Sequence, residues 1–204
     1  MVHSHIVSFC YNKPMDSLKS QIEKFKPYDE REASDRELTL YCIDAFPDVL
    51  TRKNPVCHFT ASCWVVNSEH TKALMLFHNI EQIWMWPGGH ADGESNLAEV
   101  AKREILEETN LSSAQLIDSD IFDIEVFAVP PHVRRGKFVS SHVHLNLGYI
   151  FEADESELFR VKPDENSAIR WMTFEDILVN SEIGKMSSHY QKLIDKTPKT
   201  HYNI

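Results

Sequence analysis

The sequence has no long apolar run. No stretch of its 204 residues approaches the roughly 18 consecutive apolar residues that a helix needs to cross a bilayer. The opening stretch, MVHSHIVSFCYNKPMD, lacks the basic region and the apolar run of a signal peptide. We therefore expect no membrane partner and a cytoplasmic location.

Cysteine is scarce and dispersed. The four cysteines are Cys10, Cys42, Cys57 and Cys63, and none belongs to a C-x-x-C pair. This spacing favours neither a disulfide framework nor a cysteine zinc site. Buried free thiols are the interpretation that we prefer.

Basic residues are outnumbered. Lysine and arginine total 21 against 31 acidic residues, a formal net charge of -10. Nucleic-acid-binding proteins normally present a basic face, so we expect no nucleic-acid partner. A small anionic ligand would need local cations to offset the overall charge.

The chain also lacks internal repeats, low-complexity tracts and a long Gly/Ser linker. With 42% hydrophobic and 25% charged residues, it has the composition of an ordinary globular protein. Apolar residues recur at helical spacing in MDSLKSQIEKF and DRELTLYCIDAF, which predicts a helical N-terminal extension over residues 1–50. Residues 51–204 would form the main domain. The extension could mediate a homodimer or simply pack on the sheet.

From His58 onward the pattern changes to short runs rich in β-branched and aromatic residues. Strands are predicted for HFTASCWVVN, KALMLFHN, IFDIEVFAV, HVHLNLGYIFEA and AIRWMTF. Helices are predicted for NLAEVAKREILEETN, FEDILVN and SHYQKLIDK, turns for PGG and ADG, and a basic loop for PPHVRRGKFVSS. Mixed strands flanked by helices indicate an α+β or α/β sandwich.

The helix beginning at NLAEV carries an unusual acidic patch. Glu104, Glu107 and Glu108 stand at i, i+3 and i+4, so their carboxylates project from one short patch. Such a patch could simply be solvated. The neighbouring glycines of PGGHADGE, which allow close backbone approach, favour a cation site instead. Oxygen ligands suit Mg²⁺ or Mn²⁺ better than Zn²⁺.

The segment from Gly89 to Leu111 resembles the Nudix box, the loop–helix–loop element of the Nudix hydrolases. Six residues fall in register with its pattern: Arg103, Glu104, Ile105, Glu107, Glu108 and Leu111. Glu94 stands one residue early, and Glu99 could replace it as the partner of Arg103. Asn110 occupies the place of the closing glycine and tolerates the left-handed conformation found there. The resemblance extends from about residue 58 to residue 180.

The resemblance implies the Nudix fold, an α/β/α sandwich around a mixed sheet, and cleavage of a pyrophosphate bond in a nucleoside diphosphate derivative by water attack. Carried over by motif position, Glu104, Glu107 and Glu108 would bind Mg²⁺ (or Mn²⁺) with the carbonyl of Gly88 or Gly89. Arg103 would hold the carboxylates in place. The general base would be a member of the glutamate cluster or, as in several relatives, a glutamate in a later loop.

Glu165, in KPDENSAIRW, is our candidate for that later glutamate, ahead of Asp164; a surface role is the alternative. ADP-ribose-like compounds and nucleoside triphosphates are the substrate groups that we expect. A catalytically inactive nucleotide sensor on the same scaffold is the alternative function. An isomerase is disfavoured because no cysteine lies near the motif.

Four residues are candidates for substrate binding, each with an alternative. Arg134 and Arg135, in the basic loop, could contact phosphates or be solvated. Trp86 could stack on a base or pack in the core. His142 shares a strand face with His144 and Asn146; hydrogen bonding in the cleft or packing is favoured over metal binding. His90, although inside the box, is assigned no role.

Overall fold

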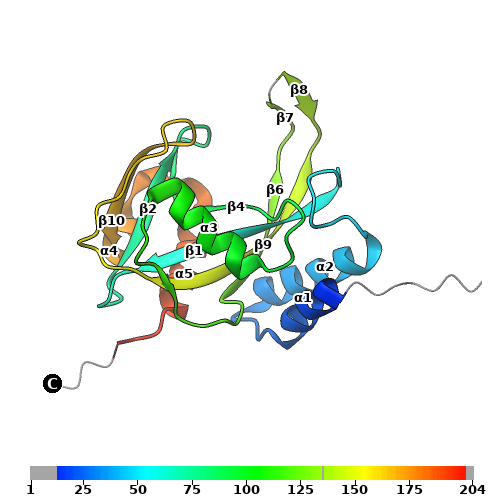
Figure 1. Cartoon of the computed structure of the whole chain (residues 1–204), viewed down its shortest axis with the longest axis horizontal. Helices are drawn as coiled ribbons and strands as arrows, with labels where there is room; N and C mark the ends of the chain where they lie inside the picture. The colour runs from blue at the N-terminus through cyan, green and yellow to red at the C-terminus, as the bar shows by residue number, and fades with distance from the viewer. Residues whose placement is uncertain (1–12, 135, 201–204) are drawn as a thin grey trace, which may run out of the picture.

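The computed structural model describes residues 13–134 and 136–200 (Figure 1). The helices are α1 (Lys13–Lys24), α2 (Glu30–Ala45), α3 (Leu97–Thr109), α4 (Phe174–Val179), the 3₁₀ helix η1 (Ser181–Met186) and α5 (Ser187–Lys196). The strands are β1 (Cys57–Val66), β2 (Lys72–His78), β3 (Trp84–Met85), β4 (Gly88–His90), β5 (Gln115–Leu116), β6 (Asp123–Val129), β7 (His132–Arg134), β8 (Lys137–Val139), β9 (His142–Glu152) and β10 (Asn166–Thr173). None of the helices in these ranges combines the length and the apolar character that a bilayer crossing requires.

The strands form one mixed sheet and one hairpin. The main path runs β10-β2-β1-β9-β5, with β3 on β2, β4 on β1 and β6 on β9. The central pair β1–β9 is parallel, whereas the other pairs are antiparallel. The β7–β8 hairpin projects beyond the sheet where β6 and β9 extend (Figure 1). The predicted mixed sheet is confirmed.

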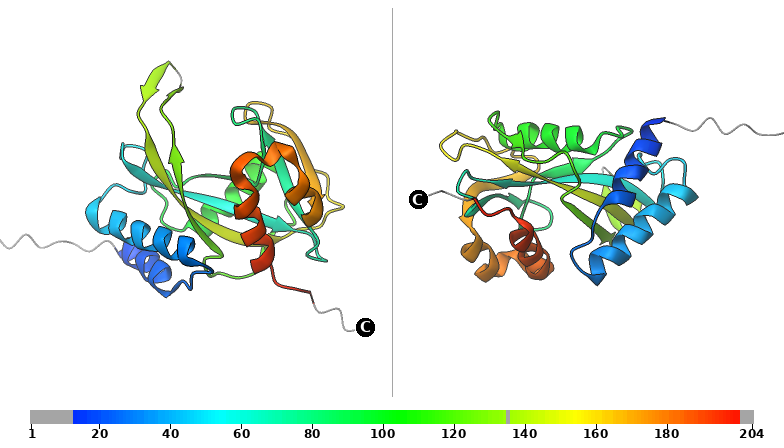
Figure 2. Two further views of the ribbon diagram at one scale, coloured as in Figure 1. Left: turned by 180° about the vertical axis from the view of Figure 1, so that it is seen from behind. Right: turned by 90° about the horizontal axis from the view of Figure 1, so that it is seen from below.

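Helices cover both faces of the sheet, as Figure 2 shows: α3 lies on one face, and α4 and α5 lie on the other. The two faces have separate cores because successive side chains of a strand point in opposite directions. On β1, Phe59 and Cys63 belong to the core under α3. Trp64 and Val66 belong to the core under α4 and α5. The predicted α/β/α sandwich is therefore confirmed.

The N-terminal helices cover an open edge of this sheet. Leu18 and Ile22 of α1 are fully buried in the core that α3 also covers. Strand β6 pairs only with β9 within the sheet, so its outer N–H groups need other acceptors. Glu32 of α2 accepts from the N–H of Ile124 at 3.2 Å, and Asp35 accepts from the N–H of Val126 at 3.1 Å. The described part of the N-terminal extension therefore packs on the sheet. The homodimer stays a prediction.

A buried ion network joins α2, β6 and α5. Lys192 Nζ lies 2.8 Å from Asp123 Oδ1 and 3.0 Å from Glu125 Oε2. Lys196 Nζ lies 2.6 Å from Glu32 Oε1, and the carboxylates of Asp123, Glu125 and Glu32 are almost completely inaccessible to solvent. Burial alone would raise the pKa of Asp123, but the adjacent cationic groups hold it at about 2. The network therefore fixes the C-terminal helix to the N-terminal extension.

Two local predictions were wrong. PGG is not a turn, because Gly88–His90 forms strand β4 against residues 60–62 of β1; β2 pairs with β1 only near Val66 and leaves that edge open. The predicted basic loop contains the β7–β8 hairpin. The ADG turn is confirmed, with φ of 47° at Asp92 and 101° at Gly93. Cys42, Cys57 and Cys63 are buried free thiols as predicted, whereas Cys10 lies outside the described residues.

Candidate functional site

Helix α3 presents the acidic patch because its opposite side is anchored in the core. Leu97, Ala101 and Ile105 are at most 1% exposed. At the N-terminus, Glu94 Oε1 accepts from the backbone N–H of Asn96 at 2.8 Å. The helix ends at Thr109 and is capped by Asn110, whose φ of 61° is left-handed as predicted. Glu94 is thus bound to backbone at the helix start.

Glu104 lies directly against the backbone of Gly89. A Cβ built on Gly89 would lie 2.7 Å from Glu104 Oε2 and nearer still to its Cδ, so only glycine leaves room for this carboxylate. Burial, followed by the charge of Glu107, raises the pKa of Glu104. The partly buried carboxylate of Glu104 therefore lies against the backbone of Gly89, where no side chain intervenes.

Glu108, one turn later, lies on the neighbouring glycine. Its Oε2 accepts from the backbone N–H of Gly88 at 2.8 Å, and the residue is only 6% exposed. Burial raises the pKa of Glu108 to about 8, although the N–H of Gly88 opposes the rise. Two carboxylates that resist ionisation side by side form a set that a bound cation would stabilise.

Glu107 completes the patch on its exposed side. Arg103 Nε lies 3.7 Å from Glu107 Oε1, with both side chains about half exposed. Arg103 therefore pairs with a glutamate of the patch, in place of the Glu94 or Glu99 partners considered from the sequence.

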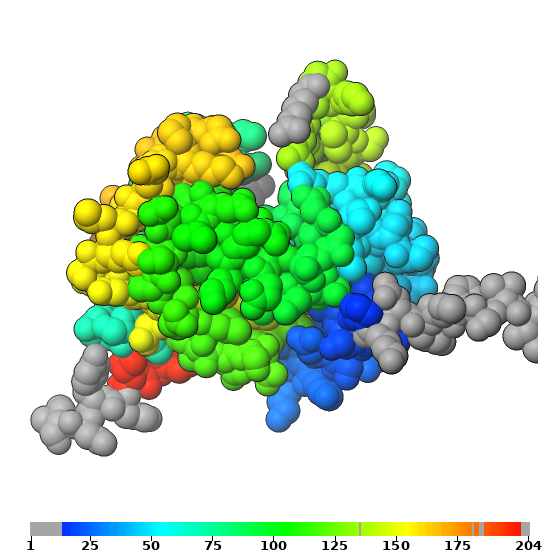
Figure 3. Space-filling model, in the orientation of Figure 1, coloured from blue at the N-terminus to red at the C-terminus, as the bar shows by residue number. Residues whose placement is uncertain are grey.

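The segment before β10 brings Glu165 to the same patch. The negative charge of Glu165 contributes to the raised pKa values of both Glu104 and Glu108. Lys162 Nζ lies 2.9 Å from Glu165 Oε2, and this hydrogen bond raises the pKa of Lys162. Figure 3 shows the yellow segment that precedes β10 beside the green surface that includes α3. Sequence reasoning missed Lys162, whose only signal is its place in KPDE.

The donor set of this patch fits a hard divalent cation. Three carboxylates and glycine backbone supply only oxygen ligands, which Mg²⁺ and Mn²⁺ prefer. The metal-binding roles predicted for Gly88, Gly89, Glu104, Glu107 and Glu108 remain predictions. The structure does bring the three carboxylates and both glycines together.

A cavity of about 380 Å³ contains two of the predicted substrate-binding residues, Arg134 and His142, and also Arg52. Arg52 Nε donates to Asp92 Oδ1 at 2.7 Å. The charge of Glu104 raises the pKa of Arg52, after the larger effect of the Asp92 hydrogen bond. Arg52 therefore lies between the cavity and the glutamate patch, and sequence reasoning missed it.

Trp86 and Arg135 are the other two residues predicted to bind substrate. Trp86 is 7% exposed, and its ring packs against His189 and Tyr190 at centroid distances of 4.7 and 5.3 Å. Trp86 thus packs in the core of this structure, and its stacking on a base stays a prediction. Arg135 lies outside the described residues.

Four histidines crowd the inner wall of the cavity: His58, His90, His142 and His144. Burial lowers the pKa of His90 to about 3, with a further contribution from the charge of Arg52. Burial and the neighbouring His90 likewise lower the pKa of His144 to about 3. His90 and His144 are therefore neutral at neutral pH. Sequence reasoning assigned His90 no role and did not single out His58.

The residues that form this site lie in a segment that matches a known protein family. A family model described as the NUDIX domain matches residues 57–196, well over half of the chain. The chain belongs to the NUDIX domain family. The match confirms the predicted resemblance and lies within the predicted main domain, whose boundary at residue 51 stays a prediction.

Curated relatives of this NUDIX chain include two named enzymes. The "RNA pyrophosphohydrolase" of Brucella abortus (strain 2308) is 33% identical over 81 residues, which cover 38% of this chain and 44% of that protein. The match thus spans less than half the length of that relative. "Phosphatase NudJ" of Escherichia coli (strain K12) is 27% identical over 131 residues, which cover 62% of this chain and 74% of that protein.

Similar solved structures also carry the family name or a hydrolase title. A C. elegans Ap4A hydrolase binary complex has 18% identity and a TM-score of 0.49, with coverage of 66% of this chain and 93% of that chain. A NUDIX family hydrolase from Clostridium perfringens has 19% identity and a TM-score of 0.49, with coverage of 68% and 96%.

Proposed function

We propose that this NUDIX protein is a Mg²⁺- or Mn²⁺-dependent pyrophosphohydrolase that cleaves a nucleoside diphosphate derivative by water attack on phosphorus. The observation that carries the proposal is the placement of Glu104 and Glu108 on Gly89 and Gly88. Partly buried carboxylates that repel one another are expected where a cation belongs. Family membership and the names of the curated relatives support the same reaction class.

Glu104, Glu107 and Glu108 would hold the cation, together with the backbone of Gly88 or Gly89. When bound, Mg²⁺ or Mn²⁺ supplies positive charge that neutralises phosphate oxygens and makes a water molecule more acidic. Arg103 keeps Glu107 on the patch through their ion pair.

Glu165 is the group that we assign to receive the proton of the attacking water. A general base must lie within reach of that water, and Lys162 holds the Glu165 carboxylate in place by direct contact at 2.9 Å. The charge of Glu165 contributes to the raised pKa values of Glu104 and Glu108, which supports its assignment to the same site. Glu107 or Glu104 is the alternative base.

The cavity beside Arg52 is the place that we assign to the remainder of the substrate. Arg52 and Arg134 supply positive charge on its wall, and guanidinium groups suit phosphate oxygens. His142 adds a hydrogen-bonding imidazole. ADP-ribose-like compounds and nucleoside triphosphates are the substrates to test first, because both place a pyrophosphate beside a moiety that this cavity can receive.

The test is a panel of nucleotides and nucleotide sugars incubated with Mg²⁺, with phosphate or monophosphate release as the readout. We expect wild type to hydrolyse at least one compound, and Glu107→Gln to reduce kcat at least about 100-fold. Glu99→Gln is the matched control, because Glu99 is an exposed glutamate of α3 outside the patch. Turnover by Glu107→Gln equal to wild type would refute the site. Nucleotide binding without turnover by wild type would support the sensor alternative instead.

Glu165→Gln separates the two candidate bases. If Glu165 is the base, the variant should lose kcat and the acidic limb of the pH–rate profile while its Mg²⁺ requirement stays unchanged. If the acidic limb persists in this variant, the base is a member of the α3 cluster.

A further inference from the structure

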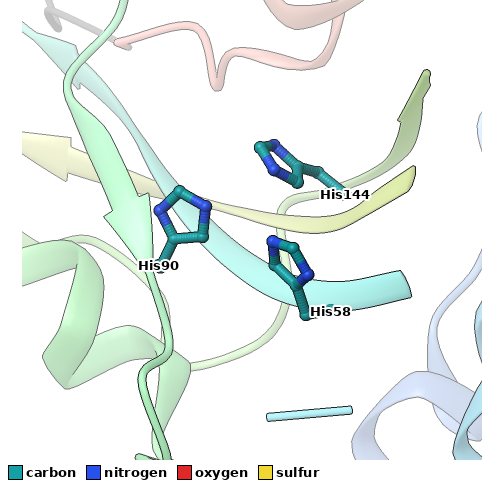
Figure 4. Close-up of side chains that lie close together, drawn as sticks. All are labelled: His58, His90 and His144. Atoms are coloured by element: carbon teal, nitrogen blue, oxygen red, sulfur yellow. The ribbon is translucent and has the colours of Figure 1, made fainter. Parts of the chain in front are cut away.

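Three strands bring three imidazoles to one point on the cavity wall. His58 on β1 pairs in register with His144 on β9, and His90 lies on β4, which pairs with the other side of β1. One ring nitrogen from each lies within 4.8 Å of those from the other two. Figure 4 shows the three rings facing a common centre. We propose that His58, His90 and His144 form a second cation site, which takes a nitrogen-preferring transition ion such as Zn²⁺.

An unpartnered buried nitrogen supports this proposal. His58 is 5% exposed, and its Nε2 has no hydrogen-bond partner. Its Nδ1 lies 3.4 Å from the backbone carbonyl of Asn54; because a carbonyl only accepts, Nδ1 carries the hydrogen. The lone pair therefore resides on Nε2. A buried polar atom without a partner is destabilising, and a metal ion would use that lone pair.

The hydrogen-bond partners of these histidines are also those of metal ligands. Histidines that bind metal usually donate their other ring N–H to a carbonyl or carboxylate, which fixes the tautomer. The contact of His58 with the Asn54 carbonyl has this form. His142 has it too, since its Nδ1 lies 2.9 Å from the carbonyl of Ser140.

His142 is placed to become a fourth ligand. Its Nε2 lies 3.3 Å from His144 Nε2. Zn–N bonds of 2.0–2.1 Å in tetrahedral geometry separate two ligand nitrogens by about 3.3 Å. The pair, which is hydrogen-bonded in this structure, therefore has the spacing of two ligands of one ion, and a ring nitrogen of His58 and of His90 lies within 4.8 Å of one of His144.

The site differs in chemistry from the glutamate patch. It offers neutral nitrogen ligands, which favour Zn²⁺, Co²⁺ and similar ions, whereas the patch offers only oxygen. The nearby positive charge of Arg52 is offset by its ion pair with Asp92. The imidazoles line the same cavity that we assign to the remainder of the substrate, but a measurement of metal binding tests them without any assay of hydrolysis.

Co²⁺ titration of metal-free wild type is the test. We expect intense visible absorption from one low-symmetry Co²⁺ with nitrogen ligands, displaced by Zn²⁺ and retained in excess Mg²⁺. His90→Gln and His144→Gln should each weaken Co²⁺ binding at least about 100-fold. His132→Gln, at an exposed histidine of the same cavity, is the matched control and should bind as wild type does. Glu104→Gln should also keep the Co²⁺ spectrum.

X-ray absorption spectra of Zn²⁺-loaded wild type test the site without any variant that could misfold. Three or four imidazole ligands at about 2.0 Å are expected. Oxygen-only coordination, or Co²⁺ affinity unchanged in both His90→Gln and His144→Gln, would overturn the proposal. Loss of Co²⁺ binding in Glu104→Gln alone would assign the ion to the glutamate patch and overturn it as well.

Discussion

Gly89→Ala is the change that tests the glutamate patch most locally. The added Cβ would lie 2.7 Å from Glu104 Oε2 and nearer still to its Cδ and Oε1, whereas ordinary contact begins at 3.4 Å, so the carboxylate must move by about 1 Å. Gly89 has no positive φ, so alanine fits its backbone. The end of the Glu104 side chain moves easily, and the fold should therefore remain. A misplacement of about 1 Å near the reacting atoms lowers the rate about 100-fold. This loss corresponds to an increase of about 2.7 kcal/mol in the activation free energy.

The assay is the initial rate of hydrolysis as a function of Mg²⁺ concentration, with thermal melting of the same samples. Gly89→Ala should lower kcat by about 100-fold and raise the Mg²⁺ concentration for half-maximal rate, with little change in Tm. Gly93→Ala is the control: its Cβ meets open space, but a φ of 101° should lower stability by about 1 kcal/mol and leave kcat intact. Full kcat and unchanged Mg²⁺ dependence in Gly89→Ala would refute the reasoning.

Three further predictions concern stability. Gly88→Ala places its Cβ 2.7 Å from the backbone oxygen of Ala61, which cannot move aside, so we expect a loss of about 1–3 kcal/mol by thermal melting; an unchanged Tm would contradict this. Lys192→Met leaves Asp123 and Glu125 buried with less compensating charge, and urea unfolding should show a loss of about 3–5 kcal/mol; an unchanged midpoint would show that the network is dispensable. The pKa of Asp123, about 2 against an ordinary 3.8, means that its ionised form stabilises the fold by about 2 kcal/mol above pH 4. That contribution should disappear as the pH falls from about 4 to about 2, and Asp123→Asn should flatten the pH dependence of urea unfolding in this range.

Local sequence patterns were sufficient to predict most helices and strands and the acidic patch on α3. Short runs rich in β-branched and aromatic residues predicted β1, β2, β6, β9 and β10, and helical spacing predicted α1, α2 and α3. The patch was predictable because i, i+3 and i+4 positions share a helix face whatever the tertiary structure. The end of α3 was predictable for a similar reason, since asparagine accepts the left-handed backbone of Asn110.

Features that depend on distant partners could not be predicted. PGG becomes strand β4 only because β1 has an open edge beside it. The histidine cluster depends on the register that sets His58 beside His144, which no local pattern encodes. Trp86 is buried by α5, about 100 residues later in the chain. The role of α2 also required the structure, because it depends on which strand has an uncovered edge.

A divalent cation bound at the α3 glutamates is the central requirement of the proposed hydrolase activity. Electron paramagnetic resonance titration of Mn²⁺ measures this directly, because Mn²⁺ prefers oxygen ligands and its free form is quantified by its spectrum. Wild type should bind Mn²⁺ in competition with Mg²⁺, and a Glu104→Gln, Glu107→Gln double variant should bind at least about 100-fold more weakly while keeping its Tm. Equal Mn²⁺ affinity in wild type and the double variant would contradict the account.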